Sequence, residues 1–131
     1  MAEAQFKHIQ CHVEQGVFVV NLLDKQLRGD ELADALRQEL IAAVNKAGTQ
    51  RVVLDFKDVD YLSSSGIRPL LSLRRHLQGG RLVLCNLGPM IADVLSATRL
   101  ISTSGSSTVP FEAAPDLATA IARLNDVGSG I

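Results

Sequence analysis

Residues 51–77 read RVVLDFKDVDYLSSSGIRPLLSLRRHL, and this stretch decides the fold. It opens with the apolar run Val52–Leu54, which is typical of a strand buried on both faces. A helical pattern follows, in which the leucines at positions 70, 73 and 77 form one inward stripe. Three serines and a glycine, residues 63–66, separate the two patterns. The stretch therefore predicts a strand, a turn lined by small hydroxyl side chains, and a helix.

The rest of the chain predicts an α/β fold, a mixed sheet with an N-terminal hairpin and parallel βα units and with helices packed against it. A strand–helix–strand unit from Arg51 to Cys85 implies a parallel pair joined by a right-handed crossover. The expected strands are Phe6–Val13, Val17–Leu23, Arg51–Phe56, Arg81–Cys85 and a short one at Val109–Phe111. The expected helices are Asp30 to about Gly48 with Asp30 as N-cap, Gly66–Gln78, Pro89 to about Thr98 and Pro115–Leu124.

The length of 131 residues predicts a single domain, residues 1–131, with a core over about residues 5–125 and a disordered tail at 126–131. Within that core we expect seven buried side chains: Val52, Leu54, Leu70, Leu73, Leu77, Val83 and Leu95. Ser102–Thr108 reads as a loop rich in serine, threonine and glycine.

The composition excludes several classes of protein. A net charge of −1 gives no general attraction to nucleic acid or to an anionic membrane surface. The opening MAEAQFKHIQ lacks a signal-peptide pattern, and no apolar run reaches membrane-spanning length. Cys11 and Cys85 both fall in expected strands and read as buried thiols of a reducing compartment. These features together predict a cytoplasmic protein that does not insert into membranes.

The serine turn is a natural place for an anion. Unpaired N–H groups and the positive end of the helix dipole meet at the start of a helix, and a phosphate on a serine there would be stabilised by both. If the helix starts near Ser64, then Ser64, Arg68, Ser72 and Arg75 form an outward stripe. Serines before a helix usually cap it without any further role, and the spacing alone favours this capping interpretation.

Pro69 bears on where this helix begins. At the fifth or sixth helical position a proline removes a needed N–H, which costs roughly 3 kcal/mol. A start near Gly66 avoids that cost, so the sequence leaves the start of the Gly66–Gln78 helix open by one turn.

The order of VVLDF, KDVDYL, SSSGI and LLSLRRHL resembles the STAS domain, named for sulfate transporters and anti-sigma-factor antagonists. In the bacterial antagonists of that family, an apolar strand ending in Asp is followed by Asp-Ser-Ser/Thr-Gly-Leu-Gly and a helix. The later stretch GGRLVLCNLGPMIADVLSATRL is similar to the family's next strand and helix. The resemblance covers roughly residues 17–124 and is firmest over residues 52–100.

The resemblance implies a switch and not a catalyst. In the antagonists, the serine directly after the motif Asp is phosphorylated by a partner anti-sigma kinase; the unphosphorylated form binds the kinase, and phosphorylation releases it. That position is Ser64 here, with Ser63 and Ser65 as its neighbours. Two positions depart from the family pattern, because Ser63 replaces the Asp and Arg68 replaces the second Gly.

The partner-binding surface implied by this resemblance consists of the serine turn, the outer face of the following helix and the acidic loop after the second strand. Its residues are Ser63, Ser64, Ser65, Gly66, Arg68, Ser72, Arg75, Asp24 and Asp30. The family places an acidic residue near the acceptor, and either Asp24 or Asp30 could occupy that place. Both aspartates also read as an ordinary surface residue or a helix cap.

Other constellations in the sequence do not support an enzyme, a metal site or a cofactor. His8 and His12 share one face of a strand while Cys11 points to the other, so the three cannot meet one metal ion. Asp55 lacks the acidic pair that a receiver domain needs to hold Mg²⁺. SSSGI lacks the first glycine of the serine-hydrolase motif, and no histidine follows late in the chain.

We therefore expect an anti-sigma-factor antagonist-like regulatory protein that binds an anti-sigma serine/threonine kinase and is switched at Ser64. The alternative is a phosphorylation-independent STAS adaptor in a signalling or transport complex. The sequence is also compatible with a weak homodimer.

Overall fold

The computed structural model describes residues 6–102 and 111–125. Within them, six strands form one sheet in the order β1-β2-β4-β6-β8-β7, and a separate two-stranded sheet pairs β3 with β5. The strands are β1 Ile9–Glu14, β2 Val17–Leu22, β3 Gln26–Leu27, β4 Arg51–Asp55, β5 Tyr61–Leu62, β6 Arg81–Cys85, β7 Ile101–Ser102 and β8 Phe111–Ala114. The helices are α1 Asp30–Ala47, α2 Ser64–His76, α3 Pro89–Ala97 and α4 Leu117–Asn125.

The sheet confirms the expected α/β architecture. β1 pairs antiparallel with β2. The other neighbouring pairs of the sheet, β2–β4, β4–β6, β6–β8 and β8–β7, are parallel. The hairpin turn consists of Gln15 and Gly16, which both have positive φ angles of 53° and 78°. Two consecutive positive φ angles are the backbone of the tight turns that match the twist of a hairpin. β1 begins at Ile9, three residues later than expected.

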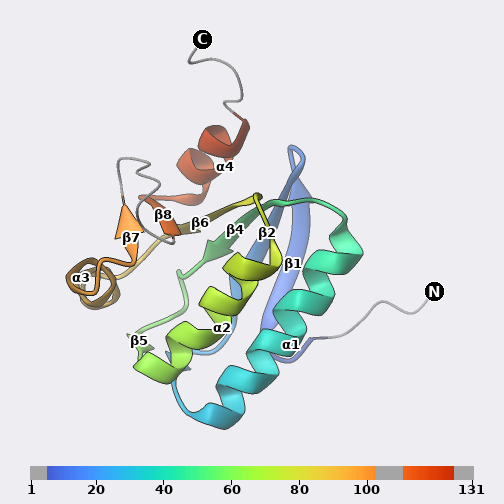
Figure 1. Cartoon of the computed structure of the whole chain (residues 1–131). Helices are drawn as coiled ribbons and strands as arrows, with labels where there is room; N and C mark the ends of the chain where they lie inside the picture. Colours follow the sequence, from blue (N-terminus) through green and yellow to red (C-terminus); the bar gives the residue numbers. More distant parts are fainter. Residues whose placement is uncertain (1–5, 103–110, 126–131) are drawn as a thin grey trace.

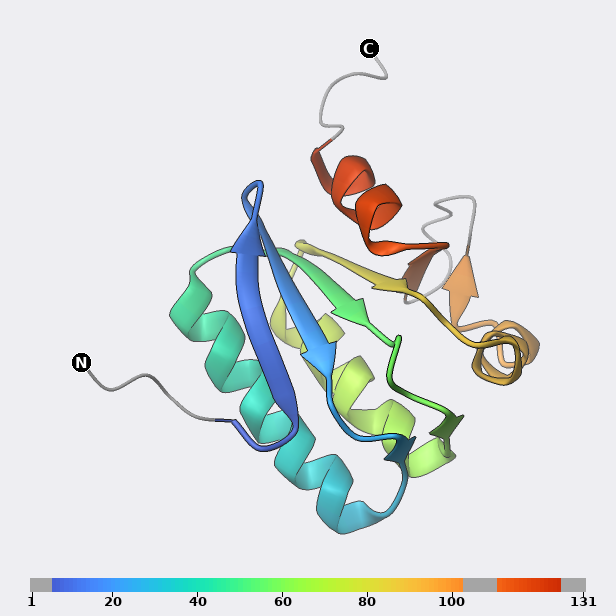
Figure 2. The same cartoon turned by 180° about the vertical axis from the view of Figure 1, so that it is seen from behind.

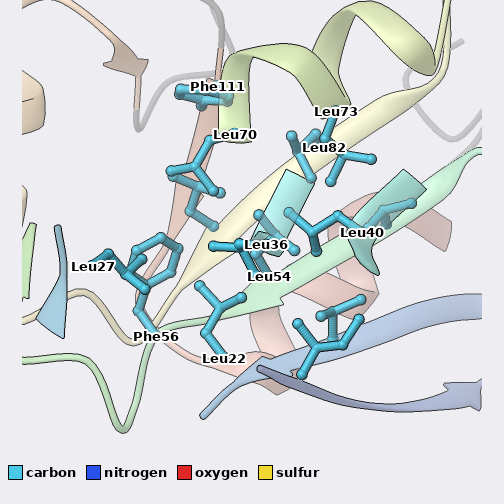
Figure 3. Close-up of a cluster of buried hydrophobic side chains, with 14 of the residues drawn as sticks. Leu22, Leu27, Leu36, Leu40, Leu54, Phe56, Leu70, Leu73, Leu82 and Phe111 are labelled. Carbon is cyan, nitrogen blue, oxygen red and sulfur yellow. The ribbon is translucent and has the colours of Figure 1, made fainter. Parts of the chain in front are cut away.

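Helices α1 and α2 lie side by side on one face of the sheet (Figure 1), and the strands lie in front of them in the opposite view (Figure 2). The larger core cluster fills this layer, with Leu36 and Leu40 of α1 and Leu70 and Leu73 of α2 meeting Leu54 of β4 (Figure 3). Side chains alternate along a strand, so the next residues face the opposite layer. There, Val53 and Val83 pack in a second cluster that includes α4.

The seven side chains expected in the core are confirmed, since none is more than 1% exposed. Cys85 is buried as expected, whereas Cys11 is only partly buried because it lies on β1, the edge strand of the sheet. Both cysteines are free thiols.

Helix α2 begins at Ser64, before the expected Gly66 and within the one turn that the sequence leaves open. Ser63 is its N-cap, in extended conformation, and accepts a hydrogen bond from the Gly66 N–H. Pro69 is therefore the sixth residue of the helix, where it lacks the N–H that would bond to the Ser65 carbonyl. The helix nevertheless starts at Ser64, with Ser63 accepting from the Gly66 N–H and donating its own N–H to the Leu27 carbonyl.

The last helix also starts later than expected, at Leu117 rather than Pro115. The Asp116 carboxylate accepts a hydrogen bond from the Thr119 N–H at 2.8 Å, so Asp116 caps the helix. This bond holds the pKa of Asp116 below its usual range.

The short strands β3, β5 and β7 were not expected. β8, Phe111–Ala114, includes Phe111 of the expected strand and continues beyond it. Pairing of β8 with β6 continues to Ala114, opposite Cys85, which extends the strand beyond Phe111. Val109, the Ser102–Thr108 loop after its first residue and the C-terminal tail at 126–131 lie outside the described residues.

Candidate functional site

The serine turn is held against the loop that enters α1. The Lys25 carbonyl accepts hydrogen bonds from the N–H groups of Asp60 and Tyr61, and β3 then runs parallel to β5. Directly after β5, the Ser63 N–H donates to the Leu27 carbonyl at 3.0 Å. These bonds bring two loops, one before each helix, into direct contact.

Gly66 is required by this contact. A Cβ atom at position 66 would lie 2.2 Å from the carbonyl oxygen of Leu27, well inside any normal contact distance. The glycine of the SSSG segment therefore allows the first turn of α2 to approach the backbone of β3. Any larger residue would push the serine turn away from the loop.

The three serine hydroxyls have different environments. The Ser63 Oγ accepts from the Gly66 N–H at 3.4 Å and lies 3.3 Å from the Leu27 carbonyl and 2.9 Å from the Ser65 Oγ. The Ser65 Oγ accepts from the Gly29 N–H at 2.9 Å. Ser64 is exposed, and its hydroxyl makes no hydrogen bond with any part of the chain that the structure describes. Two serines thus build the turn, and the third presents its hydroxyl to solvent.

Arg68 and Asp30 form an ion pair between the first turns of α2 and α1. The Arg68 Nη2 donates to the Asp30 Oδ1 at 2.5 Å. Asp30 is the first residue of α1, so its expected role as N-cap is wrong. Gly29 is the N-cap, because its φ of 89° suits glycine, and no side chain caps the helix there.

Asp24 makes its contact away from the turn. Its Oδ2 lies 2.7 Å from the Nδ1 of His8, just before β1. Of the two acidic residues considered from the sequence, the structure thus brings Asp30 to the α2 face and pairs Asp24 with the hairpin.

A groove of about 230 Å³ lies between α1 and α2 and includes part of the expected partner-binding surface. Arg68 and Ser72 line it from α2, and Arg75 does not. Its acidic side chains are each paired, Asp30 with Arg68 and Asp34 with Arg37 at 2.8 Å. The groove is lined by Asp30, Ala33, Asp34, Arg37, Arg68, Pro69 and Ser72.

Arg28 lies beside the serine turn and was not among the residues expected there. It lies between Leu27 and Gly29, whose backbone groups bond to Ser63 and Ser65. Its side chain is exposed and has no hydrogen-bond or ion-pair partner in the described structure. The sequence signal was only a basic residue in an expected loop, because its proximity to the serines depends on the pairing of β3 with β5.

The histidines and cysteines do not come together in one site in the described structure. His8 pairs with Asp24, and the Nε2 of His12 lies 3.0 Å from the Glu14 Oε1. Across residues 6–102 and 111–125, no cluster of three or more metal-ligating side chains occurs. Burial raises the pKa of Cys11 to about 11 and, with the Asp55 carboxylate nearby, that of Cys85 to about 12. Both thiols are therefore protonated and unreactive near neutral pH.

Comparison with known proteins identifies the family. The family model described as the STAS domain matches residues 30–113. The chain belongs to the STAS domain family. The family match excludes the receiver alternative, and the regulatory, non-enzymatic character of the family excludes the hydrolase alternative. Asp55 accordingly has structural contacts, accepting from the Lys57 N–H and the Asn86 side-chain amide, each at 3.0 Å.

Relatives agree with this assignment. The chain is 38% identical over 93 residues to the Bordetella bronchiseptica protein named "Putative anti-sigma factor antagonist BtrV", over 70% of this chain and 79% of that protein. An anti-sigma-factor antagonist (STAS) domain protein from Planctomyces limnophilus has the same fold, with a TM-score of 0.71 and 19% identity over 89% of this chain and 97% of that chain.

The fold is also that of SpoIIAA, an anti-sigma factor antagonist with structures of both its unphosphorylated and its phosphorylated form. The unphosphorylated form superposes with a TM-score of 0.63 and 20% identity, over 91% of this chain and 99% of that chain. The phosphorylated form, from Bacillus, gives a TM-score of 0.59 and 22% identity, over 88% of this chain and 98% of that chain. At this identity the match establishes the fold.

None of the helices within the described ranges is long and apolar enough to cross a membrane.

Proposed function

We propose that this STAS protein acts as an anti-sigma-factor antagonist that binds an anti-sigma serine/threonine kinase and is released when that kinase phosphorylates Ser64. The observation that supports this most directly is the difference among the three serines. Ser64 is exposed with an unbonded hydroxyl in the described structure, whereas the Oγ atoms of Ser63 and Ser65 bond within the turn. A phosphoacceptor oxygen must reach the donor phosphate of a kinase, and Ser64 meets that condition without breaking the turn.

The chemistry needs nothing from this chain beyond the acceptor hydroxyl. In phosphoryl transfer the kinase positions the nucleotide and its metal ions and takes the proton from the acceptor. The STAS domain contributes a rigid presentation of Ser64 at the start of α2, supported by the Ser63 N-cap and by the close approach of Gly66 to Leu27. A phosphate there would add almost two negative charges to the surface that faces the partner.

Replacement of the family Asp by Ser63 is compatible with this role. The Ser63 hydroxyl performs the capping function that a carboxylate at this position could perform, by accepting the Gly66 N–H. The first turn of α2 after this N-cap contains no acidic residue either. A phosphate on Ser64 would therefore meet the positive helix end without a neighbouring carboxylate on its own turn to repel it.

The alternative function is a phosphorylation-independent adaptor, and the serine at position 63, in place of the family Asp, favours it. If the kinase recognises the motif carboxylate, Ser63 removes that recognition, and the α1–α2 face would bind a partner constitutively. For either function we propose that residues 1–131 form a single domain. We also propose that the protein is located in the cytoplasm, the compartment of such a kinase.

Intact-mass and fragment-ion analysis tests the proposal. The protein is incubated with ATP and the anti-sigma-type serine/threonine kinases encoded in the same genome. The proposed switch requires one phosphate, assigned to Ser64 by the fragment ions and absent from Ser64→Ala. A kinase that binds the protein stably but transfers no phosphate would favour the adaptor. Binding to no kinase, with or without phosphate, would refute the antagonist function.

A further inference from the structure

A phosphate on Ser64 would have one arginine about a single helical turn away on its own face of α2. Arg68 is four residues along α2 from Ser64, and side chains at this spacing are neighbours on a helix surface. In the unmodified protein Arg68 already has a partner, because its Nη2 donates to the Asp30 Oδ1 of α1. Any interaction of Arg68 with a phosphate must therefore compete with Asp30.

The competition favours the phosphate. The side chains of Arg68 and Asp30 are 62% and 87% exposed, and ion pairs between such exposed groups are weak. A phosphoserine carries up to twice the charge of a carboxylate and offers three acceptor oxygens to the guanidinium fork. It is also attached to the same helix as Arg68, so no second element has to be held in place.

We propose that Arg68 binds the phosphate on Ser64 and leaves Asp30 to do so, and that this exchange changes the charge of the groove between α1 and α2. The proposal rests on the proposed phosphorylation of Ser64. Arg28 belongs to the loop whose backbone bonds to Ser63 and Ser65.

The exchange links the phosphate to a surface beyond the serine turn. In the unmodified protein each acidic side chain of the groove has a basic partner, Asp30 with Arg68 and Asp34 with Arg37. When Arg68 turns to the phosphate, Asp30 loses its partner, and the groove gains a net negative charge next to the new phosphate. A partner docked over α1 and α2 would then meet repulsion at two places instead of one.

The test uses the full chain with phosphoserine installed at position 64 during translation, so that no kinase is needed. ³¹P NMR titration reports the second pKa of the phosphate. Loss of a neighbouring guanidinium raises this pKa, and we expect Arg68→Gln to raise it by about half a pH unit. Arg75→Gln is the matched control, because Arg75 is exposed on α2 but lies about two turns farther from Ser64.

A double-mutant cycle tests the exchange itself. Asp30→Asn removes the competing carboxylate. In the protein that keeps Arg68, this change should lower the phosphate pKa below its value with Asp30 present. This effect should disappear in the Arg68→Gln background, because it acts through Arg68. Both side chains are exposed, so the variants are expected to fold.

Two results would overturn the proposal. The first is a phosphate pKa in Arg68→Gln no different from that in Arg75→Gln, which would exclude contact between Arg68 and the phosphate. The second is an Asp30→Asn effect that persists unchanged without Arg68, which would show direct repulsion and no exchange. Failure of every kinase to phosphorylate Ser64 would instead count against the proposed function and leave these titrations unaffected.

Discussion

Gly66→Ala tests whether the contact between α2 and the β3–α1 loop holds the serine turn. The added Cβ would lie 2.2 Å from the Leu27 carbonyl oxygen and 2.9 Å from two further Leu27 atoms. Leu27 would have to move by roughly 1 Å, and forcing an extra methyl group into a packed contact costs about 1–3 kcal/mol. The movement also strains the bond from the Ser63 N–H to the Leu27 carbonyl, which is worth about 1 kcal/mol.

One effect opposes this cost. Alanine is a better helix former than glycine by up to about 1 kcal/mol, and position 66 is inside α2. The net expectation is a loss of about 2 kcal/mol in the free energy of unfolding. Urea titration followed by circular dichroism measures this as a lower midpoint with an unchanged slope.

Gly88→Ala is the control for this substitution. Gly88 also lies at a helix start, as the N-cap of α3, but no heavy atom lies within 4 Å of its Cβ position. Its φ of −66° suits any residue, so the change should cost no more than about 1 kcal/mol, from the weaker N-cap preference of alanine. A Gly66→Ala protein as stable as Gly88→Ala would refute the argument that the loop contact positions the serine turn.

The remaining predictions concern the serine hydroxyls and the thiols. Ser65→Ala should destabilise the protein by about 1 kcal/mol through loss of the bond to the Gly29 N–H, whereas Ser64→Ala should change stability by less than about 0.5 kcal/mol; equal urea midpoints would contradict the assignment of roles. At pH 8 the thiolate fraction should be roughly a hundredfold lower for Cys11, and roughly a thousandfold lower for Cys85, than for a thiol with the ordinary pKa of 9.0. Alkylation followed by mass spectrometry should therefore be slow at Cys11 and slower still at Cys85. Fast alkylation of Cys85 in the folded protein would contradict its burial. Above pH 9 the folded protein retains thiol protons that the unfolded chain loses, because the pKa values of the thiols are raised in the folded state. The free energy of unfolding should therefore fall as pH rises from about 9 to about 12, and should fall less steeply in Cys85→Ala than in the wild type. Identical slopes for the two proteins would contradict the raised pKa of Cys85.

Local patterns in the sequence were enough to predict the main layers of the fold. Apolar runs predicted β4 and β6, and the leucine stripe predicted the buried face of α2, because hydrophobic burial follows the period of each element. Capping was harder to predict. Asp30 reads as a good N-cap, but the chain places Gly29 there and uses Asp30 to pair with Arg68.

The parts that sequence reasoning missed depend on contacts between distant segments. β3 and β5 are two residues long, and neither has a pattern of its own; they form because Lys25 and Leu27 bond to residues more than thirty positions away. That pairing also brings Arg28 to the serine turn and Asp30 to Arg68. The resemblance to the STAS family pointed to Ser64, and the structure adds which serine hydroxyls are already bonded and which charges surround them.

The central claim, that a phosphate on Ser64 switches partner binding, is tested most directly by calorimetric titration of the partner anti-sigma kinase with the unmodified protein and with the protein carrying phosphoserine at position 64. The account predicts that the unmodified protein binds and that the phosphate weakens binding by at least about tenfold, through repulsion at the serine turn and at the α1–α2 groove. Equal affinities for the two forms would contradict the account and leave a constitutive adaptor as the function of this STAS domain.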